Sequence, residues 1–176
     1  ISAVTSVLRS GWLSTGDVCN RFSESFASYL KEDVYCIPVS SCTMGLILSL
    51  MASNIKNGDE VIVPAITFCS TANAVFSVGA KPVFVDVKED GTIDPKMIEK
   101  AMNSRTRAII PVHYTGKACD MDDIMKIANR RNLHVIEDCA HAFGGTYKGK
   151  SLGTMGELAS FSFYPTKNIT SGEGGM

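Results

Sequence analysis

The chain has 176 residues, with 17 basic and 18 acidic side chains and 45% hydrophobic residues. This length is enough for one domain with a buried core. The balanced charge gives no reason to expect nucleic acid or an anionic membrane as a partner. No apolar run approaches the roughly 20 residues of a membrane helix. We therefore expect a globular protein that binds neither nucleic acid nor membrane.

The cysteines and the start of the chain bear on its location. The six cysteines are scattered and form no CxxC pair, which argues against a zinc site or a redox motif. A domain of this size does not need disulfides, so we expect reduced thiols. The start, ISAVTSVLRS, lacks the basic-then-apolar order of a signal peptide. These features favour a cytoplasmic location.

The first third of the chain predicts two helices and one strand. The first helix spans Asp17 to Leu30 and would be capped by Thr15 or Asp17. A strand is predicted over Val34 to Val39. The second helix is predicted over Thr43 to Ala52.

Four apolar, β-branched runs then recur at similar spacing. Each is unbroken, as in strands that are buried on both faces. The runs are Glu60 to Pro64, Pro82 to Val87, Ala108 to His113 and His134 to Asp138. Helices are predicted between them, over Ser70 to Val78, Pro95 to Met102 (capped by Asp94) and Asp120 to Arg131. With a last strand over Leu158 to Phe163, the order predicts a mainly parallel α/β sheet flanked by helices on both faces.

One segment matches a nucleotide-binding pattern. Gly144 to Ser151, GGTYKGKS, fits the P-loop sequence G-x-x-x-x-G-K-[ST]. A working P-loop leaves its strand directly and enters a helix. Here the predicted strand ends six residues earlier, at Asp138, and Gly153 and Gly156 disfavour a following helix. We interpret residues 147–150 as a hairpin tip.

Ligands of open α/β sheets bind at the carboxyl ends of the strands. The residues predicted at those ends are Ser40 to Thr43, Phe68, Asp86, His113, Asp138, His141 and Ser162 to Lys167. This set suits an aromatic, phosphorylated cofactor that carries a carbonyl group. From position alone, each residue keeps an ordinary alternative. The aromatic and the histidines fit a core, the acid fits a helix cap or an ion pair, and the lysine fits the surface.

Several motifs together resemble one known family. They are GWLSTG (11–16), SSCTMGL (40–46), GDEVIVPAITFCSTANAV (58–75), KPVFVDV (81–87), IIPVHYTG (109–116), VIEDCAHAFG (135–144) and FSFYPTKNITSGEGG (161–175). In their order and spacing they are similar to the sugar aminotransferases of the DegT/DnrJ/EryC1/StrS group. These enzymes depend on pyridoxal phosphate and have the aspartate-aminotransferase-like fold. The resemblance implies that residues 1–176 form the cofactor-binding large domain.

The resemblance implies three catalytic residues. Lys167 is the lysine that carries pyridoxal 5'-phosphate, and Asp138 pairs with the pyridine nitrogen. His141 lies near the ring hydroxyl. An acid in this position keeps the ring nitrogen protonated, so that the ring can accept electrons. A lysine in this position can both hold the cofactor and carry a proton.

The same resemblance implies further cofactor contacts. Phe68 stacks on the ring and fixes its plane. Ser162, the backbone N–H groups at Cys42 and Thr43 and the Thr43 hydroxyl bind the phosphate. A helix N-terminus is suited to this task, because its first N–H groups are free and its dipole favours an anion. Cys42 departs from the family, in which Gly or Ala is common at this place.

The implied reaction moves an amino group from an amino acid, usually glutamate, to a nucleotide-linked keto-sugar. The expected context is amino-sugar biosynthesis for cell-surface polysaccharide, in a homodimer with shared active sites. Lys167 favours transamination over the dehydration performed by relatives that lack this lysine. Another pyridoxal-phosphate enzyme of the same fold, such as a lyase or a sugar dehydratase, and a non-catalytic cofactor-binding protein remain as alternatives. Because the chain stops in a Gly-rich turn, we expect a truncated protein without the C-terminal small domain.

Overall fold

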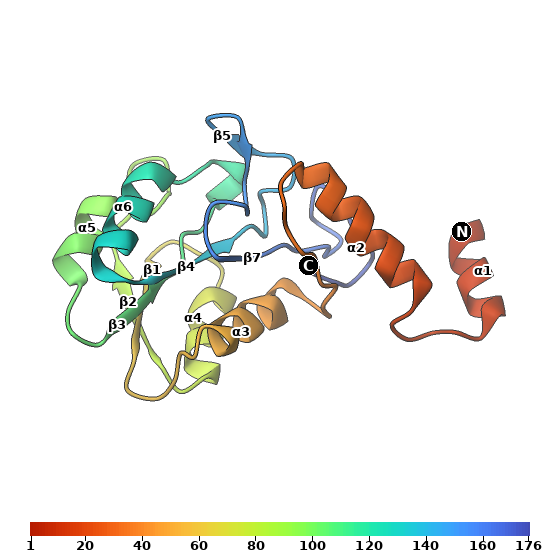
Figure 1. Cartoon of the computed structure of the whole chain (residues 1–176), viewed down its shortest axis with the longest axis horizontal. Coiled ribbons are helices and arrows are strands. Elements are labelled where there is room, and N and C mark those ends of the chain that lie inside the picture. The colour runs from red at the N-terminus through yellow and green to blue at the C-terminus, as the bar shows by residue number, and fades with distance from the viewer. The chain divides into compact units, whose positions relative to one another are not determined.

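The computed structural model describes all 176 residues, which form two compact units, Ile1–Pro38 and Val39–Met176. The first unit contains helices α1 (Ser2–Ser10) and α2 (Asp17–Leu30), shown in red and orange in Figure 1. The predicted bounds of α2 are confirmed, whereas α1 was not predicted. The predicted cap of α2 is wrong, because its N-cap is Gly16 and no side chain caps it.

The turn before α2 depends on Trp12. The indole Nε1 donates a hydrogen bond to the Thr15 carbonyl at 2.9 Å. A Cβ atom at Gly16 would lie 2.3 Å from the same Nε1. A side chain at position 16 would therefore displace the Trp12 indole from this hydrogen bond, which accounts for part of the GWLSTG motif.

The strand predicted over Val34 to Val39 does not form. Only Val39 makes a bridge, an antiparallel one to Gly175, which pairs in turn with Ser162. Tyr35 is 98% exposed and Ile37 71% exposed. A strand needs a hydrogen-bonded neighbour along its length, and within this chain only residue 39 has one.

The second unit is built on a five-stranded parallel sheet with the order β2-β1-β3-β4-β7. Its strands are β1 (Glu60–Pro64), β2 (Lys81–Val85), β3 (Thr106–Ile109), β4 (His134–Asp138) and β7 (Leu158–Ser160). The predicted bounds of β1 and β4 are confirmed. The third and last strands are shorter than predicted, and beyond each only a single bridge residue, Val112 or Ser162, continues the pairing.

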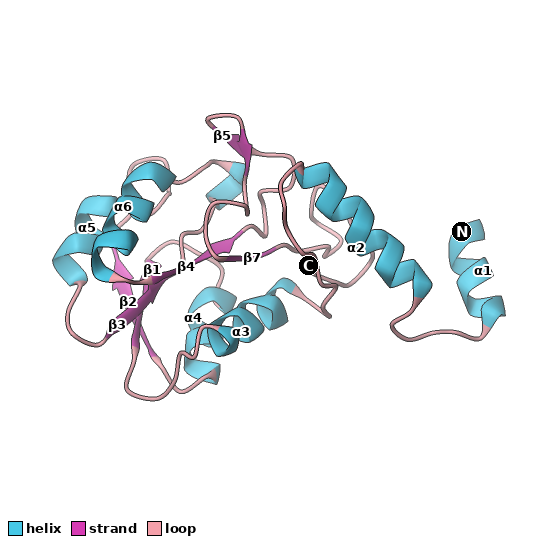
Figure 2. Ribbon diagram, in the orientation of Figure 1, coloured by secondary structure: helices cyan, strands magenta, loops and turns pink.

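Helices cover both faces of the sheet, as predicted (Figure 2). They are α3 (Cys42–Ala52), α4 (Ser70–Ser77), α5 (Pro95–Ala101) and α6 (Met121–Arg131). Val61 and Val63 of β1 pack in one core cluster with α3 and α4, whereas Ile62 packs in the other with α5 and α6. Successive strand residues point to opposite faces, so this division places one pair of helices on each side.

Local details confirm some sequence predictions and correct others. Asp94 caps α5, because its side chain accepts a hydrogen bond from the Lys96 N–H, with Pro95 in the first turn. The second strand is not buried on both faces: Phe84 is 55% exposed. A short 3₁₀ helix, η1 (Tyr114–Gly116), follows β3 and was not predicted.

The P-loop-like segment is a hairpin. Strands β5 (Thr146–Tyr147) and β6 (Lys150–Ser151) pair antiparallel, and no helix follows them. The structural context that a P-loop requires is therefore absent, as the sequence indicated. All six cysteines are free thiols. No helix combines the length and apolar character needed to cross a membrane.

Candidate active site

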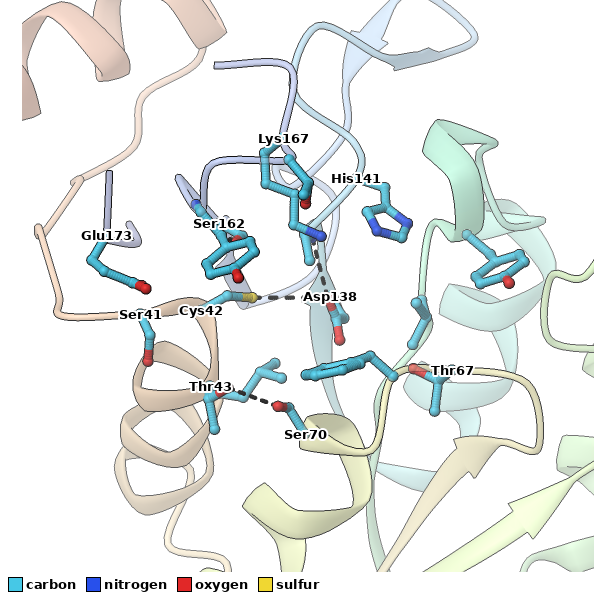
Figure 3. Close-up of a pocket in the computed structure, with 18 residues that line it drawn as sticks. Ser41, Cys42, Thr43, Thr67, Ser70, Asp138, His141, Ser162, Lys167 and Glu173 are labelled. Atoms are coloured by element: carbon cyan, nitrogen blue, oxygen red, sulfur yellow. Dashed lines mark hydrogen bonds between the residues drawn. The ribbon is translucent and has the colours of Figure 1, made fainter. Parts of the chain in front are cut away.

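All seven predicted cofactor-site residues line one cavity of about 740 Å³ in the second unit. They are Cys42, Thr43, Phe68, Asp138, His141, Ser162 and Lys167 (Figure 3). The cavity lies at the carboxyl ends of β1, β4 and β7 and at the N-termini of α3 and α4. Ser41, within the predicted range Ser40 to Thr43, also lines it, whereas sequence reasoning did not predict Thr67, Ser70 and Tyr114 there.

One part of the cavity is suited to an anion. Ser41 caps α3 by accepting a hydrogen bond from the Met44 N–H. The backbone N–H groups of the first residues, Cys42 and Thr43, have no partner within the helix. The Thr43 hydroxyl donates to Ser70 Oγ at 2.8 Å, which links the starts of α3 and α4. Hydroxyl and N–H donors thus converge where a helix dipole also favours negative charge.

Asp138 is the buried acid of the cavity. Its Oδ1 accepts a hydrogen bond from the Ala140 N–H at 3.1 Å, and its Oδ2 accepts one from the Thr71 hydroxyl at 2.9 Å. The Cys42 thiol approaches Oδ1 at 3.9 Å. Burial raises the pKa of Asp138, although the hydrogen bonds from Ala140 and Thr71 oppose that rise. A buried carboxylate needs such donors or a cationic partner.

Phe68 and His141 present rings to the cavity from different loops. Phe68 follows β1 and is 73% exposed, so it is not a core residue. His141 follows β4, and its Nδ1 accepts a hydrogen bond from the Thr115 N–H at 3.3 Å. Since Nδ1 accepts, the proton of the neutral ring is on Nε2. Burial, and then the charge of Lys167, lower the pKa of His141, which favours this neutral donor form.

Lys167 supplies the only amine among the residues that line the cavity. It follows β7 in a turn in which its N–H donates to the Tyr164 carbonyl at 2.9 Å. Figure 3 shows Lys167 and His141 next to each other, with Asp138 below them in this view. An amine, a neutral imidazole and a carboxylate are thus available to one ligand.

His113 is not part of this cavity, contrary to one sequence prediction. It is fully buried, and its Nε2 lies 2.8 Å from Glu137 Oε2. Its Nδ1 accepts from the Cys119 N–H, so Nε2 carries the proton. Cys139 adds a third ligand atom within 4.8 Å. The Glu137 carboxylate, however, already accepts hydrogen bonds from three backbone N–H groups, which indicates a structural network rather than a metal site.

Asp86, the other acid predicted at a strand end, is exposed and does not line this cavity. His134 pairs with Glu157 at the opposite end of β4, as expected for a structural histidine.

A second cavity of about 550 Å³ adjoins the first. The two share His141, Thr166 and Lys167. The remaining wall consists of neutral residues: Thr115, Gly116, Phe143, Gly144, Gly145 and Asn168. Thr115 has a left-handed backbone with φ of 54°, an uncommon conformation for threonine that often marks functional sites. None of the predicted anion-binding residues reaches this second cavity.

Comparison with known proteins identifies the family of the chain. The family model described as the DegT/DnrJ/EryC1/StrS aminotransferase family matches residues 1–176. The chain belongs to this family. The SpsC spore coat polysaccharide biosynthesis protein of Bacillus subtilis is 46% identical over 100% of this chain and 45% of SpsC.

Two solved structures of the family are closely similar to the chain. An aminotransferase from Psychrobacter cryohalolentis has a TM-score of 0.95 and 43% identity, over 99% of this chain and 45% of that one. The ntda protein of Bacillus subtilis, with bound cofactor PMP, has a TM-score of 0.93 and 38% identity, over 99% and 39%. The sheet of this DegT/DnrJ/EryC1/StrS chain is thus the fold of pyridoxal-phosphate aminotransferases, as predicted. The chain spans about half the length of the curated relatives it matches.

Proposed function

We propose that this chain is the pyridoxal-phosphate-binding large domain of a sugar aminotransferase. The observation that carries the proposal is the convergence of Lys167, Asp138 and an anion-binding pair of helix starts on one cavity. Membership of the family and the PMP bound to the ntda protein support the same cofactor.

The residues of the cavity fit this cofactor chemically. Its phosphate suits the Ser41 and Ser70 hydroxyls and the free N–H groups of Cys42 and Thr43, with Ser162 in the same cavity. Phe68 offers an exposed ring face to an aromatic group. Asp138 is a buried acid without a cationic partner, and a protonated pyridine nitrogen would supply one. The volume of about 740 Å³ lies in the range of small-molecule cofactor sites.

Each catalytic side chain would have a distinct task. Pyridoxal phosphate, when bound, supplies an aldehyde for the amine and a ring that stabilises negative charge at the substrate carbon. Lys167 Nζ would hold the cofactor and would also carry a proton to and from the substrate carbon. Asp138 would pair with the ring nitrogen and keep it protonated. His141, with its proton on Nε2, would offer a hydrogen bond to a polar group of the cofactor.

The acceptor would be a nucleotide-linked keto-sugar, and the second cavity supports this part of the proposal. That cavity meets the first at Lys167 and His141, which is the reacting end, and lies away from the anion-binding end. Its wall offers hydroxyl, amide and peptide groups and one aromatic ring, with no cation besides Lys167. Such a wall suits a neutral, polyhydroxylated ring better than a dicarboxylate.

The donor, the assembly and the cellular setting are further parts of the proposal. We infer an amino-acid donor, with glutamate as the first to test. We also infer a cytoplasmic homodimer with shared active sites, acting in amino-sugar biosynthesis for cell-surface polysaccharide. The similarity to SpsC supports the polysaccharide context.

The two half-reactions test the proposed activity separately. The complete protein would be loaded with pyridoxal phosphate and mixed with glutamate, and the loss of the aldehyde form would be followed by visible absorbance. A panel of nucleoside-diphosphate keto-hexoses would then be added, and mass spectrometry would search for an amino-sugar. Lys167→Ala should abolish both steps. A wild-type protein that binds the cofactor but aminates no keto-hexose would refute the acceptor class.

A further inference from the structure

Thr71 lies directly behind Asp138 and is fully buried. It belongs to the first turn of α4, and its Oγ1 donates to Asp138 Oδ2 at 2.9 Å. Thr67 Oγ1 lies 2.8 Å from Thr71 Oγ1 on the other side. Thr71 lines neither cavity, whereas Thr67 lines the first. Thr71 therefore cannot touch a ligand, and any effect it has on chemistry must pass through Asp138.

The direction of the two hydrogen bonds follows from the contact between Thr71 and the acid. Thr71 has a single hydroxyl proton, and it is donated to Asp138 Oδ2. Thr67 must then donate to Thr71. The hydroxyls form a chain that points from Thr67 through Thr71 to Asp138, and this orientation stabilises the ionised form of the acid.

The same contacts set the direction in which Asp138 can act. Oδ1 accepts from the Ala140 N–H and is approached by the Cys42 thiol, which lies nearer to the Ser160 carbonyl, at 3.5 Å. Oδ2 accepts only from Thr71. A carboxylate has about four acceptor positions, two on each oxygen. One acceptor position on Oδ2 is thus left for a donor in the cavity. The hydrogen bond from Thr71 fixes the rotation of the Asp138 carboxylate, so that this position stays accessible.

We propose that Thr71 is a positioning residue that, with Thr67 behind it, holds Asp138 ionised and turned toward the ring nitrogen of the cofactor. This inference rests on the proposed function. It assigns a task to a threonine that sequence reasoning did not single out. The task differs from fold maintenance, because it changes the proton on the cofactor ring.

The test uses the complete protein loaded with pyridoxal phosphate that carries ¹⁵N in the ring. Thr71→Val removes the hydroxyl with little change of shape, and Thr71→Ser keeps it. We expect the ¹⁵N signal of the ring to be that of a protonated nitrogen in wild type and Thr71→Ser. In Thr71→Val it should move toward the unprotonated value. The kcat of the donor half-reaction should fall about ten-fold or more in Thr71→Val, with little change in KM.

Thr106→Val is the matched control. Thr106 is also a buried threonine whose hydroxyl is hydrogen-bonded, in this case by the Asn103 N–H, but it lies at the opposite end of the sheet. This variant should lose stability and keep the wild-type ¹⁵N signal. An unchanged signal in Thr71→Val, or an equal shift in Thr106→Val, would overturn the inference.

Two further outcomes are informative. If Thr71→Val does not retain the cofactor, Thr67→Val replaces it. A partial ¹⁵N shift in Thr67→Val supports the hydroxyl chain, and no shift overturns it. Failure of the wild-type protein to bind pyridoxal phosphate at all would instead remove the proposed function, and this inference with it.

Discussion

The Glu137→Gln substitution should destabilise the second unit strongly, although Glu137 lines neither of the two cavities. Its Oε1 accepts from the Met155 and Gly156 N–H groups, at 2.7 and 2.6 Å. Its Oε2 accepts from the Gly153 N–H at 2.9 Å and lies 2.8 Å from His113 Nε2. All four partners are donors, so this carboxylate ties β4 to the turn over residues 153–156 and to the segment that follows β3.

Glutamine keeps the shape of the side chain but replaces one of these oxygens by an NH₂ group. Two of the four hydrogen bonds are then lost, and two buried donors face another donor. At about 1–3 kcal/mol for each unsatisfied buried group, the loss should be about 4 kcal/mol of unfolding free energy. This loss is large but still smaller than the roughly 5–15 kcal/mol by which a typical domain is stable. The variant should therefore still fold at 25 °C.

Urea denaturation of the chain, followed by far-ultraviolet circular dichroism, would measure this loss. Glu99→Gln is a suitable control, since Glu99 is about half exposed and pairs with Arg130 on the surface. That control should change stability by less than about 1 kcal/mol. If Glu137→Gln also stayed within about 1 kcal/mol of wild type, the network would not be the structural tie described here.

Three other results are expected. Hydrogen bonds from Asn103 and Arg105 lower the pKa of Glu60 to about 2. Ionised Glu60 therefore adds about 3 kcal/mol to the free energy of unfolding at pH values above its unfolded pKa near 4.5, and this contribution is lost as pH falls toward 2. Glu60→Gln should have a lower free energy of urea unfolding than wild type at pH 7 and a smaller dependence of that free energy on pH in that window, and a wild-type slope there would contradict this. NMR titration of His141 should give a midpoint below 6.5, and a midpoint above it would refute the neutral donor form. Asn168→Ala should raise KM for the keto-hexose and spare the glutamate half-reaction, with exposed Asn73→Ala as control; equal loss in both half-reactions would count against the second cavity as the acceptor site.

The bounds of β1 and β4 could be predicted because these two strands are buried along almost their whole length. The segment over Val34 to Val39 has a similar apolar sequence, but only Val39 pairs with another part of the chain. Local pattern measures the tendency of a segment to be extended, and pairing depends on residues far away in the chain.

The candidate site was predictable to the extent that its members lie at strand ends. Lys167 and Asp138 have recognisable motifs, and the structure brings them to one cavity. His113 has the same position at a strand end, yet its ring turns away to Glu137. Thr71 was missed because a threonine in a helix's first turn has no distinctive sequence signal. Its importance comes from a contact with a residue 67 positions later.

The attachment of pyridoxal phosphate to Lys167 is the central claim, and it can be measured directly. The complete protein would be incubated with pyridoxal phosphate, reduced with borohydride, digested and mapped by mass spectrometry. We predict a phosphopyridoxyl group on the peptide that contains Lys167, and none in Lys167→Ala. An unmodified Lys167 peptide, or a label on another lysine that survives the substitution, would contradict the account.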